Sequence, residues 1–169
     1  MGRLFCFFFV QTMFFSLLGV PLQHNPQMQP YMKQLKPLQL VIQQSPYSMS
    51  ETMERLEKGI KAKGIAIFAI IDHSGAAQKV NMKLIDEKVI IFGDPKVGTF
   101  LMQENPLIGM ELPLRILVWQ NAEGDIQIAY IDPMTLGESY EIIRNSEILK
   151  KMSTGLANLV AEVVKPSPE

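Results

Sequence analysis

The sequence predicts an α+β domain with an antiparallel sheet and helices packed on one face. Three observations lead to this fold class. β-rich apolar runs recur along the chain, one capped amphipathic helix follows the first of them, and a long helix ends the domain. Most connections between consecutive strands are too short for a parallel crossover. The predicted element order is therefore β-α-β(3-4)-α over residues 38–165.

The composition is that of one globular domain with a real core. Of the 169 residues, 47% are hydrophobic and 20% are charged, and the formal net charge is −1. These values differ from those of disordered or fibrous chains. The chain also has no basic stripe with interleaved aromatic residues, so we expect no nucleic-acid partner.

The N-terminus has the features of a signal peptide over residues 1–19. Arg3 precedes an apolar core from Leu4 to Leu18, and small residues near Gly19 offer a cleavage site. This predicts a periplasmic or secreted protein. The alternatives are an uncleaved anchor in the inner membrane over residues 4–20 and a buried helix, and only an anchor would make the membrane a partner. Cys6 is the only cysteine, so the cleaved chain would have neither a disulfide nor a thiol nucleophile.

Residues 20–37 are rich in Pro and Gln and predict an extended tether ahead of the domain. The segment has no helical or strand period. His24 lies in this tether, where a solvated histidine is expected. Residues 166–169 are expected to form a frayed tail.

The first part of the domain predicts a strand, a helix and a second strand. Residues 38–44 alternate as a strand does. Ser48 and Glu51 form a capping-box pattern, and Gly64 is the expected stop of the helix. The residues that share one face of this helix are Met49, Met53, Leu56 and Ile60. Residues 65–71 then predict a buried strand.

The remaining elements follow in the order of the chain. Residues 72–80 predict one short helical turn, and residues 81–92 predict a strand or a strand pair. A short helix is expected from Thr99 to the residues before Pro106. Asn105-Pro106 and Asp132-Pro133 are interpreted as turn starters. The last expected elements are a strand over 114–120, a loop around Gly124, a strand over 126–131 and a helix from Ser146.

Three blocks of the sequence resemble a known family. They are "FAIIDH", "IIFGDPKVGTFLMQENPLIGMELPLRILVW" and "YIDP", and their order and spacing are similar to those of the bacterial domain of unknown function family 302 over roughly residues 40–150. The resemblance implies a small α+β domain with a TATA-binding-protein-like arrangement and a homodimer. The family has no settled activity to carry over, so the resemblance leaves function open.

Asp72 and His73 stand where a predicted buried strand ends, a place where functional side chains collect. His73, the only histidine of the domain, could act as a general base oriented by Asp72 or Asp132. The alternative is a histidine hydrogen-bonded to loop backbone. Adjacent residues of a strand point to opposite faces, so Asp72 and His73 need not touch.

The segment "GDPKVGT", residues 93–99, offers a second candidate site. It lacks the phosphate-loop pattern, because Lys96 precedes Gly98 and no lysine follows that glycine. A weaker possibility is an anion held at a helix start by Asp94, Lys96 and Thr99. The alternative is ordinary turn chemistry, in which Thr99 caps the helix.

Arg115 is a charge inside an apolar predicted strand. It either faces solvent or pairs with Asp72, Asp94 or Asp132, and Tyr130 could complete such a cluster. Trp119 is expected in the core or in a dimer interface.

No metal or cofactor is expected, since one histidine and scattered carboxylates lack the spacing of a zinc site. A nucleophile elbow of the G-x-S-x-G kind is also missing.

Three functions follow as alternatives. The first is an exported, dimeric module that binds a small anionic or apolar ligand. The second is a small hydrolase or isomerase that uses His73 as its base, so enzymatic activity stays open. The third is a structural or interaction protein without a small-molecule site. The first two depend on one inference, that the loops leaving neighbouring strands meet at a common rim.

Overall fold

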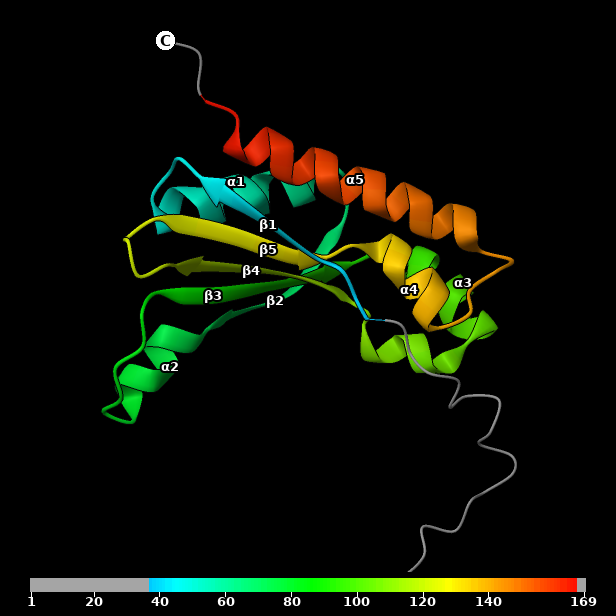
Figure 1. The fold of residues 1–169 in the computed structure, drawn as a ribbon, viewed down its shortest axis with the longest axis horizontal. Coiled ribbons are helices and arrows are strands. Elements are labelled where there is room, and N and C mark those ends of the chain that lie inside the picture. Colours follow the sequence, from blue (N-terminus) through cyan, green and yellow to red (C-terminus); the bar gives the residue numbers. More distant parts are fainter. Residues whose placement is uncertain (1–36, 167–169) are drawn as a thin grey trace, which may run out of the picture. The chain divides into compact units, whose positions relative to one another are not determined.

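The computed structural model describes residues 37–166, and its centre is a five-stranded antiparallel sheet (Figure 1). The strands are β1 (Leu40–Ser45), β2 (Ala66–Asp72), β3 (Glu87–Gly93), β4 (Leu114–Gln120) and β5 (Ile126–Ile131). Their order across the sheet is β1-β5-β4-β3-β2, and each neighbouring pair is antiparallel. The predicted α+β class with an antiparallel sheet is confirmed.

Two long helices cover one face of this sheet. The helical segments are α1 (Met49–Ala62), α2 (His73–Lys79), α3 (Pro95–Glu104), the 3₁₀ segment η2 (Pro106–Met110), α4 (Pro133–Ser139) and α5 (Ser146–Val164). Figure 1 shows α1 and α5 side by side on the same face, α2 directly after β2, and α3 and α4 near the opposite end of the sheet. The expected helices after Ser48 and from Ser146 are confirmed. The expectation of a bare turn at Asp132-Pro133 is wrong, because α4 begins there.

Two apolar clusters form the core. The larger lies between the sheet, α1 and α5, and includes Leu56, Ile60, Ile90, Ile116 and Val160. The smaller joins α3, η2, α4 and the start of α5, and includes Leu101, Ile108, Leu136 and Leu149. The helix face predicted by the spacing of Met49, Met53, Leu56 and Ile60 is the buried face of α1.

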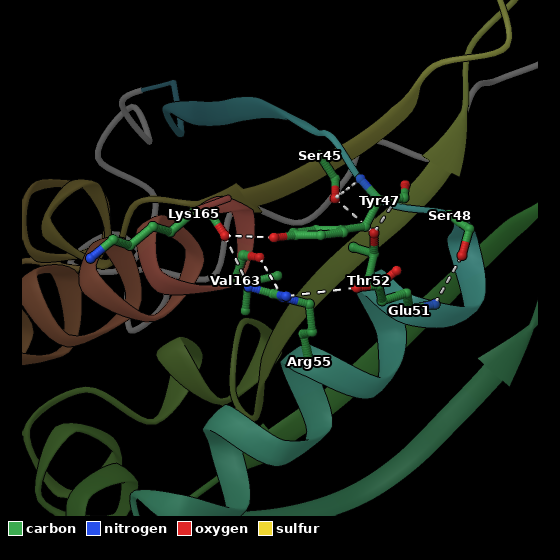
Figure 2. A network of polar contacts seen from close by, with 8 residues as sticks. All are labelled: Ser45, Tyr47, Ser48, Glu51, Thr52, Arg55, Val163 and Lys165. Carbon is green, nitrogen blue, oxygen red and sulfur yellow. Dashed lines mark hydrogen bonds and ion pairs between the residues drawn. The ribbon is translucent and has the colours of Figure 1, made fainter. Parts of the chain in front are cut away.

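A polar network ties α1 to the end of α5 (Figure 2). Arg55 donates from Nε to the carbonyl oxygen of Val163 at 2.8 Å and from Nη2 to that of Lys165 at 3.0 Å. The Tyr47 hydroxyl donates to the same Lys165 oxygen at 2.7 Å, and the Arg55 guanidinium lies 3.9 Å from the centre of the Tyr47 ring. A cation at the last carbonyls of a helix stabilises that helix end.

We expect Arg55→Met to lower the free energy of unfolding by about 1–3 kcal/mol, because two charge-assisted hydrogen bonds are lost. Calorimetric unfolding measures the change. The control is Lys58→Met, which makes the same kind of change at an exposed position of α1. Equal losses in the two variants would contradict a special role for Arg55 at the end of α5.

The predicted signal peptide over residues 1–19 and the predicted tether over residues 20–37, apart from residue 37, lie outside the described part of the chain, as do residues 167–169 of the predicted tail. They stay predictions. Among residues 37–166, no helix combines the length and the apolar character that crossing a membrane requires.

Candidate functional site

The residues proposed for a common rim lie at two ends of the sheet. In the β2–β3 pair, Asp72 lies opposite Lys88 and Ala66 lies opposite Gly93. His73 therefore follows one end of β2, while Lys96 lies just beyond the other end, and six residues of extended strand span about 20 Å. The inference that His73 and Lys96 share one rim is wrong, because an antiparallel pair places the two C-terminal ends far apart.

The Asp72 carboxylate caps α2. It accepts hydrogen bonds from the Gly75 N–H at 2.7 Å and the Ser74 hydroxyl at 2.9 Å, and it lies 3.7 Å from Lys88 Nζ. The Gly75 N–H, the Ser74 hydroxyl and Lys88 together hold the pKa of Asp72 below its ordinary value, although desolvation opposes them. The carboxylate is directed to these groups rather than to His73, the half-buried first residue of α2.

Asp132 lies at the other end of the sheet, at the end of β5. Its carboxylate accepts from the Met134 N–H at 3.0 Å and caps α4. Since Ile131 pairs with Leu40 and Tyr130 with Ile116, this end of β5 lies with the start of β4 and not with the end of β2. The hypothesis that Asp132 orients His73 is therefore wrong.

The turn at residues 93–99 is the beginning of α3. Asp94 is the N-cap and accepts from the Lys96 N–H at 2.9 Å, with Pro95 as the first helical residue. Thr99 lies within α3, so the expectations that the helix starts at Thr99 and that Thr99 caps it are wrong. The missed signal is Asp-Pro itself, because an N-cap aspartate followed by proline is a common helix start.

Asp94, Lys96 and Thr99 do come together at a cavity of about 610 Å³. It lies between α3, α5 and the end of the sheet, at the junction of the two core clusters. Its apolar lining includes Phe68, Phe92, Phe100, Met102, Leu112, Leu114, Ile148, Met152, Leu156 and Leu159. Its volume and apolar walls are those of a small-molecule site.

The charged groups of the cavity are mostly basic. Lys63, Lys96 and Lys151 line it together with a single carboxylate, that of Asp94. The Asp94 carboxylate already caps α3, and Lys63 makes only a long ion pair with Glu162 at 3.9 Å. The cavity thus combines an apolar interior with an excess of positive charge.

Arg115 and Tyr130 do not line this cavity. Of the two alternatives for Arg115, the one in which it faces solvent is confirmed, because its side chain is exposed. Its Nη2 lies 2.8 Å from Glu111 Oε2, so the alternative in which it pairs with Asp72, Asp94 or Asp132 is wrong. The ring of Tyr130 packs in the larger core cluster, where burial and then the charge of Asp132 raise its pKa above the ordinary 10.0. Neither residue joins a polar cluster with the predicted aspartates.

Sequence reasoning missed several residues of the cavity. Phe68 and Phe100 carried no signal beyond apolar character, and Gly155 and Lys151 carried none. Met152 lies on α5, the helix that was expected from Ser146, and it also lines the cavity. Among residues 37–166, no group of three or more histidine, cysteine, aspartate or glutamate side chains is placed to hold a metal ion.

Comparison with known proteins places these observations in a family. Residues 41–160 match the family described as "Domain of unknown function DUF302". A crystal structure of an uncharacterized conserved DUF302 protein from Bacillus stearothermophilus is similar, with a TM-score of 0.66, 21% identity, and coverage of 75% of this chain and 98% of that chain. At that identity the likeness shows the fold.

Similar stretches also occur in longer proteins. This chain is 35% identical, over 117 residues or 69% of its length, to proteins described as fluoride-specific ion channel FluC 1 from Brucella suis and from Brucella abortus. The match covers 46% of the first protein and 43% of the second, so the chain spans less than half the length of these curated relatives.

Proposed function

The chain belongs to the DUF302 family, and on that premise we propose that its domain is a small-ligand-binding module. The cavity between α3, α5 and the end of the sheet carries this proposal. Its volume of about 610 Å³ falls within the roughly 300–1,000 Å³ of ligand pockets. The ligand is an amphiphile with an apolar body and one anionic group.

The apolar walls select the body of the ligand. Three phenylalanine side chains, Phe68, Phe92 and Phe100, lie among the lining residues, with Leu156 and Met152 on α5. Burying an apolar chain against them is favourable by about 25 cal/mol for each Å² removed from water. A ligand that is polar along its whole length would lose its water without hydrogen-bond partners in exchange.

The lysines select the anionic group. Lys96 on α3 and Lys151 on α5 face the same cavity from two elements, and each can neutralise a carboxylate, sulfonate or phosphate at the mouth. Partial desolvation at such a mouth strengthens an ion pair above its value in open water.

Fluoride, named for the Brucella relatives, suits this cavity poorly. A small, strongly hydrated anion needs several hydrogen-bond donors, and apolar side chains dominate these walls. We assign the channel activity of those proteins to the part of their chains that this domain does not match. In those longer proteins, a ligand-binding module of this kind would accompany the part of the chain that has the channel activity.

The hydrolase or isomerase alternative has less support. It needs a carboxylate that orients His73, and Asp72 is directed to Gly75, Ser74 and Lys88 while Asp132 lies at the other end of the sheet. The cavity is also remote from His73, which does not line it.

Calorimetric titration of the full-length protein with dodecanoate and with dodecanol tests the proposal. We expect Lys96→Met and Lys151→Met each to weaken dodecanoate binding about tenfold, equivalent to about 1.4 kcal/mol, and to change dodecanol binding little. The matched control is Lys150→Met, the neighbouring exposed lysine of α5 that does not line the cavity.

Two results would overturn the proposal. One is that neither compound binds the unmodified protein. The other is that Lys150→Met weakens dodecanoate binding as much as Lys96→Met does, which would reduce the effect to the general charge of the surface.

A further inference from the structure

The mouth of the cavity is surrounded by apolar side chains that reach into solvent. Phe68 on β2 and Phe100 on α3 both line the cavity, and they are 53% and 54% exposed. Met102, another lining residue on α3, is also exposed. Folded domains usually bury aromatic side chains, so a group of exposed ones around an opening marks an interaction surface.

This apolar surface continues over the neighbouring segment η2. Gly109 packs beside Met102, since a Cβ built on that glycine would lie 3.6 Å from the Met102 sulfur atom. On the same segment Leu107 is 41% exposed and Met110 is 75% exposed, and neither lines the cavity. The apolar surface thus extends beyond the cavity, and ligand binding inside the cavity does not account for this outer part.

Basic side chains lie at the same mouth. Lys63, Lys96 and Lys151 line the cavity and are exposed. Within the described part of the chain, neither Lys96 nor Lys151 forms an ion pair, and Lys63 has the 3.9 Å pair with Glu162. The carboxylate of Asp94, which lines the cavity too, is engaged as the cap of α3. The mouth is therefore positive, although the formal net charge of the chain is −1.

We propose that this face docks on a bilayer of anionic lipids, and that the amphiphile passes directly between the bilayer and the cavity. The inference rests on the proposed function and adds the source of its ligand. The exposed phenylalanine and methionine side chains enter the boundary between head groups and acyl chains. The lysines around the mouth pair with the lipid phosphates. The domain makes this contact itself, whatever the fate of the N-terminal segment.

The chemistry of the mouth favours a bilayer over a protein partner. The apolar rim and the lysines surround an opening into an apolar cavity, so whatever contacts this face must leave the amphiphile a path inward. A bilayer provides that path, because the ligand itself dissolves in it, and its anionic head groups complement the positive charge of the mouth. A protein partner would instead cover the opening with a closely packed interface.

Sedimentation of the full-length protein with lipid vesicles tests the docking. Equal parts of phosphatidylcholine and phosphatidylglycerol give an anionic surface, and phosphatidylcholine alone gives a neutral one. We expect Met110→Asp to weaken binding to the anionic vesicles at least about tenfold, because a charge replaces a side chain that enters the bilayer. Leu107→Asp should act in the same direction. Both variants should bind dodecanoate in vesicle-free solution within about threefold of the unmodified protein, since neither residue lines the cavity.

The matched control is Met82→Asp. Met82 is 66% exposed in the connection from α2 to β3, and Lys79 and Lys83 lie close to it in the sequence. It offers the same side chain in a comparable basic setting, but at the end of the sheet opposite to the cavity. We expect this variant to bind the anionic vesicles within about threefold of the unmodified protein.

Transfer of a fluorescent dodecanoate from the protein to the vesicles gives a second measurement. We expect a transfer rate that rises with vesicle concentration and is at least about tenfold higher with the anionic vesicles. A rate independent of vesicle concentration means that the ligand first dissolves in water, and it overturns the proposal. So does a Met110→Asp variant that binds vesicles and transfers ligand as the unmodified protein does, or a Met82→Asp variant that loses as much. These results leave the proposed function standing if dodecanoate binds in solution, whereas an absence of dodecanoate binding overturns both.

Discussion

Gly155→Phe should abolish binding of the amphiphile while the protein stays folded. Gly155 lies on α5 and lines the cavity. A Cβ placed at this position would meet no atom within 4 Å, so a larger side chain enters empty space rather than protein. The phenyl ring then occupies the volume that the apolar body of the ligand needs.

The stability of the variant separates this effect from unfolding. A glycine in the interior of a helix costs about 0.5–1 kcal/mol relative to alanine, and Gly155 is in the interior of the 19-residue α5. Replacing it therefore should not lower the unfolding temperature. We expect at least a hundredfold loss of dodecanoate affinity, equivalent to about 3 kcal/mol of binding free energy. The midpoint of thermal unfolding should stay unchanged or rise.

The matched variant is Gly155→Ala. It gains helix propensity in the same way but adds only one methyl group, so binding should stay within about threefold of the unmodified protein. Titration and thermal unfolding of both variants decide the matter. If Gly155→Phe binds dodecanoate normally, the ligand lies elsewhere and the cavity has no part in recognition.

Local patterns in the sequence were sufficient for the main elements of the fold. The capping box at Ser48 and the periodic Met49, Met53 and Leu56 locate α1, whose N-cap hydroxyl accepts from the Glu51 N–H as expected. Short connections indicated antiparallel pairing, which the strand order confirms. These elements could be predicted because each signal lies within a few neighbouring residues of the sequence.

One repeated local signal was misread. At Asp94-Pro95, Asn105-Pro106 and Asp132-Pro133, the side chain before proline accepts the N–H two residues later and a helical segment begins. Proline suits the first helical position because its missing N–H would have no partner there. Treating the three pairs as turns concealed α4 and displaced the start of α3.

The site depends on contacts between residues that are far apart in the sequence, and local sequence patterns do not indicate such contacts. Its lining runs from Lys63 to Leu159, so the cavity exists only when α3 and α5 pack at the same end of the sheet. Arg115 on β4 forms an ion pair with Glu111, which precedes that strand. The alternation of residues along the strand could not indicate this partner. The prediction that His73 and Lys96 share a common rim is wrong, because the β2–β3 pairing places His73 at the end of the sheet opposite to Lys96.

The second large effect concerns the joint between α3 and α5. Glu104, the last residue of α3, accepts hydrogen bonds from the backbone N–H groups of Ile143 and Arg144, both at 2.7 Å, and of Asn145 at 3.0 Å. The Asn145 side chain donates to it as well, at 2.8 Å. The side chain of Asn145 does not itself cap α5, so Glu104 supplies the negative charge that this helix start favours.

Glu104→Gln should lower the midpoint of thermal unfolding by about 5–10 °C near neutral pH. The amide keeps one acceptor oxygen but turns an NH₂ group toward N–H donors, which leaves at least one of the donors of Ile143, Arg144 and Asn145 without its partner. The control is Glu147→Gln, the same change at an exposed residue in the first turn of α5. A similar fall in both variants would mean that only the general charge near the helix start matters.

The pH dependence gives the sharpest form of this prediction. Burial of the Glu104 carboxyl opposes its ionisation, but the N–H groups of Arg144, Ile143 and Asn145 outweigh burial and hold its pKa below the ordinary 4.5. A lowered pKa in the folded protein means that the stabilisation is complete above the ordinary value and is lost as pH falls through the lowered one. The difference in midpoint between the unmodified protein and Glu104→Gln should therefore be constant above pH 4.5 and shrink in more acidic buffer. If the difference persists unchanged at acid pH, the ionised carboxylate is not what holds α3 to α5.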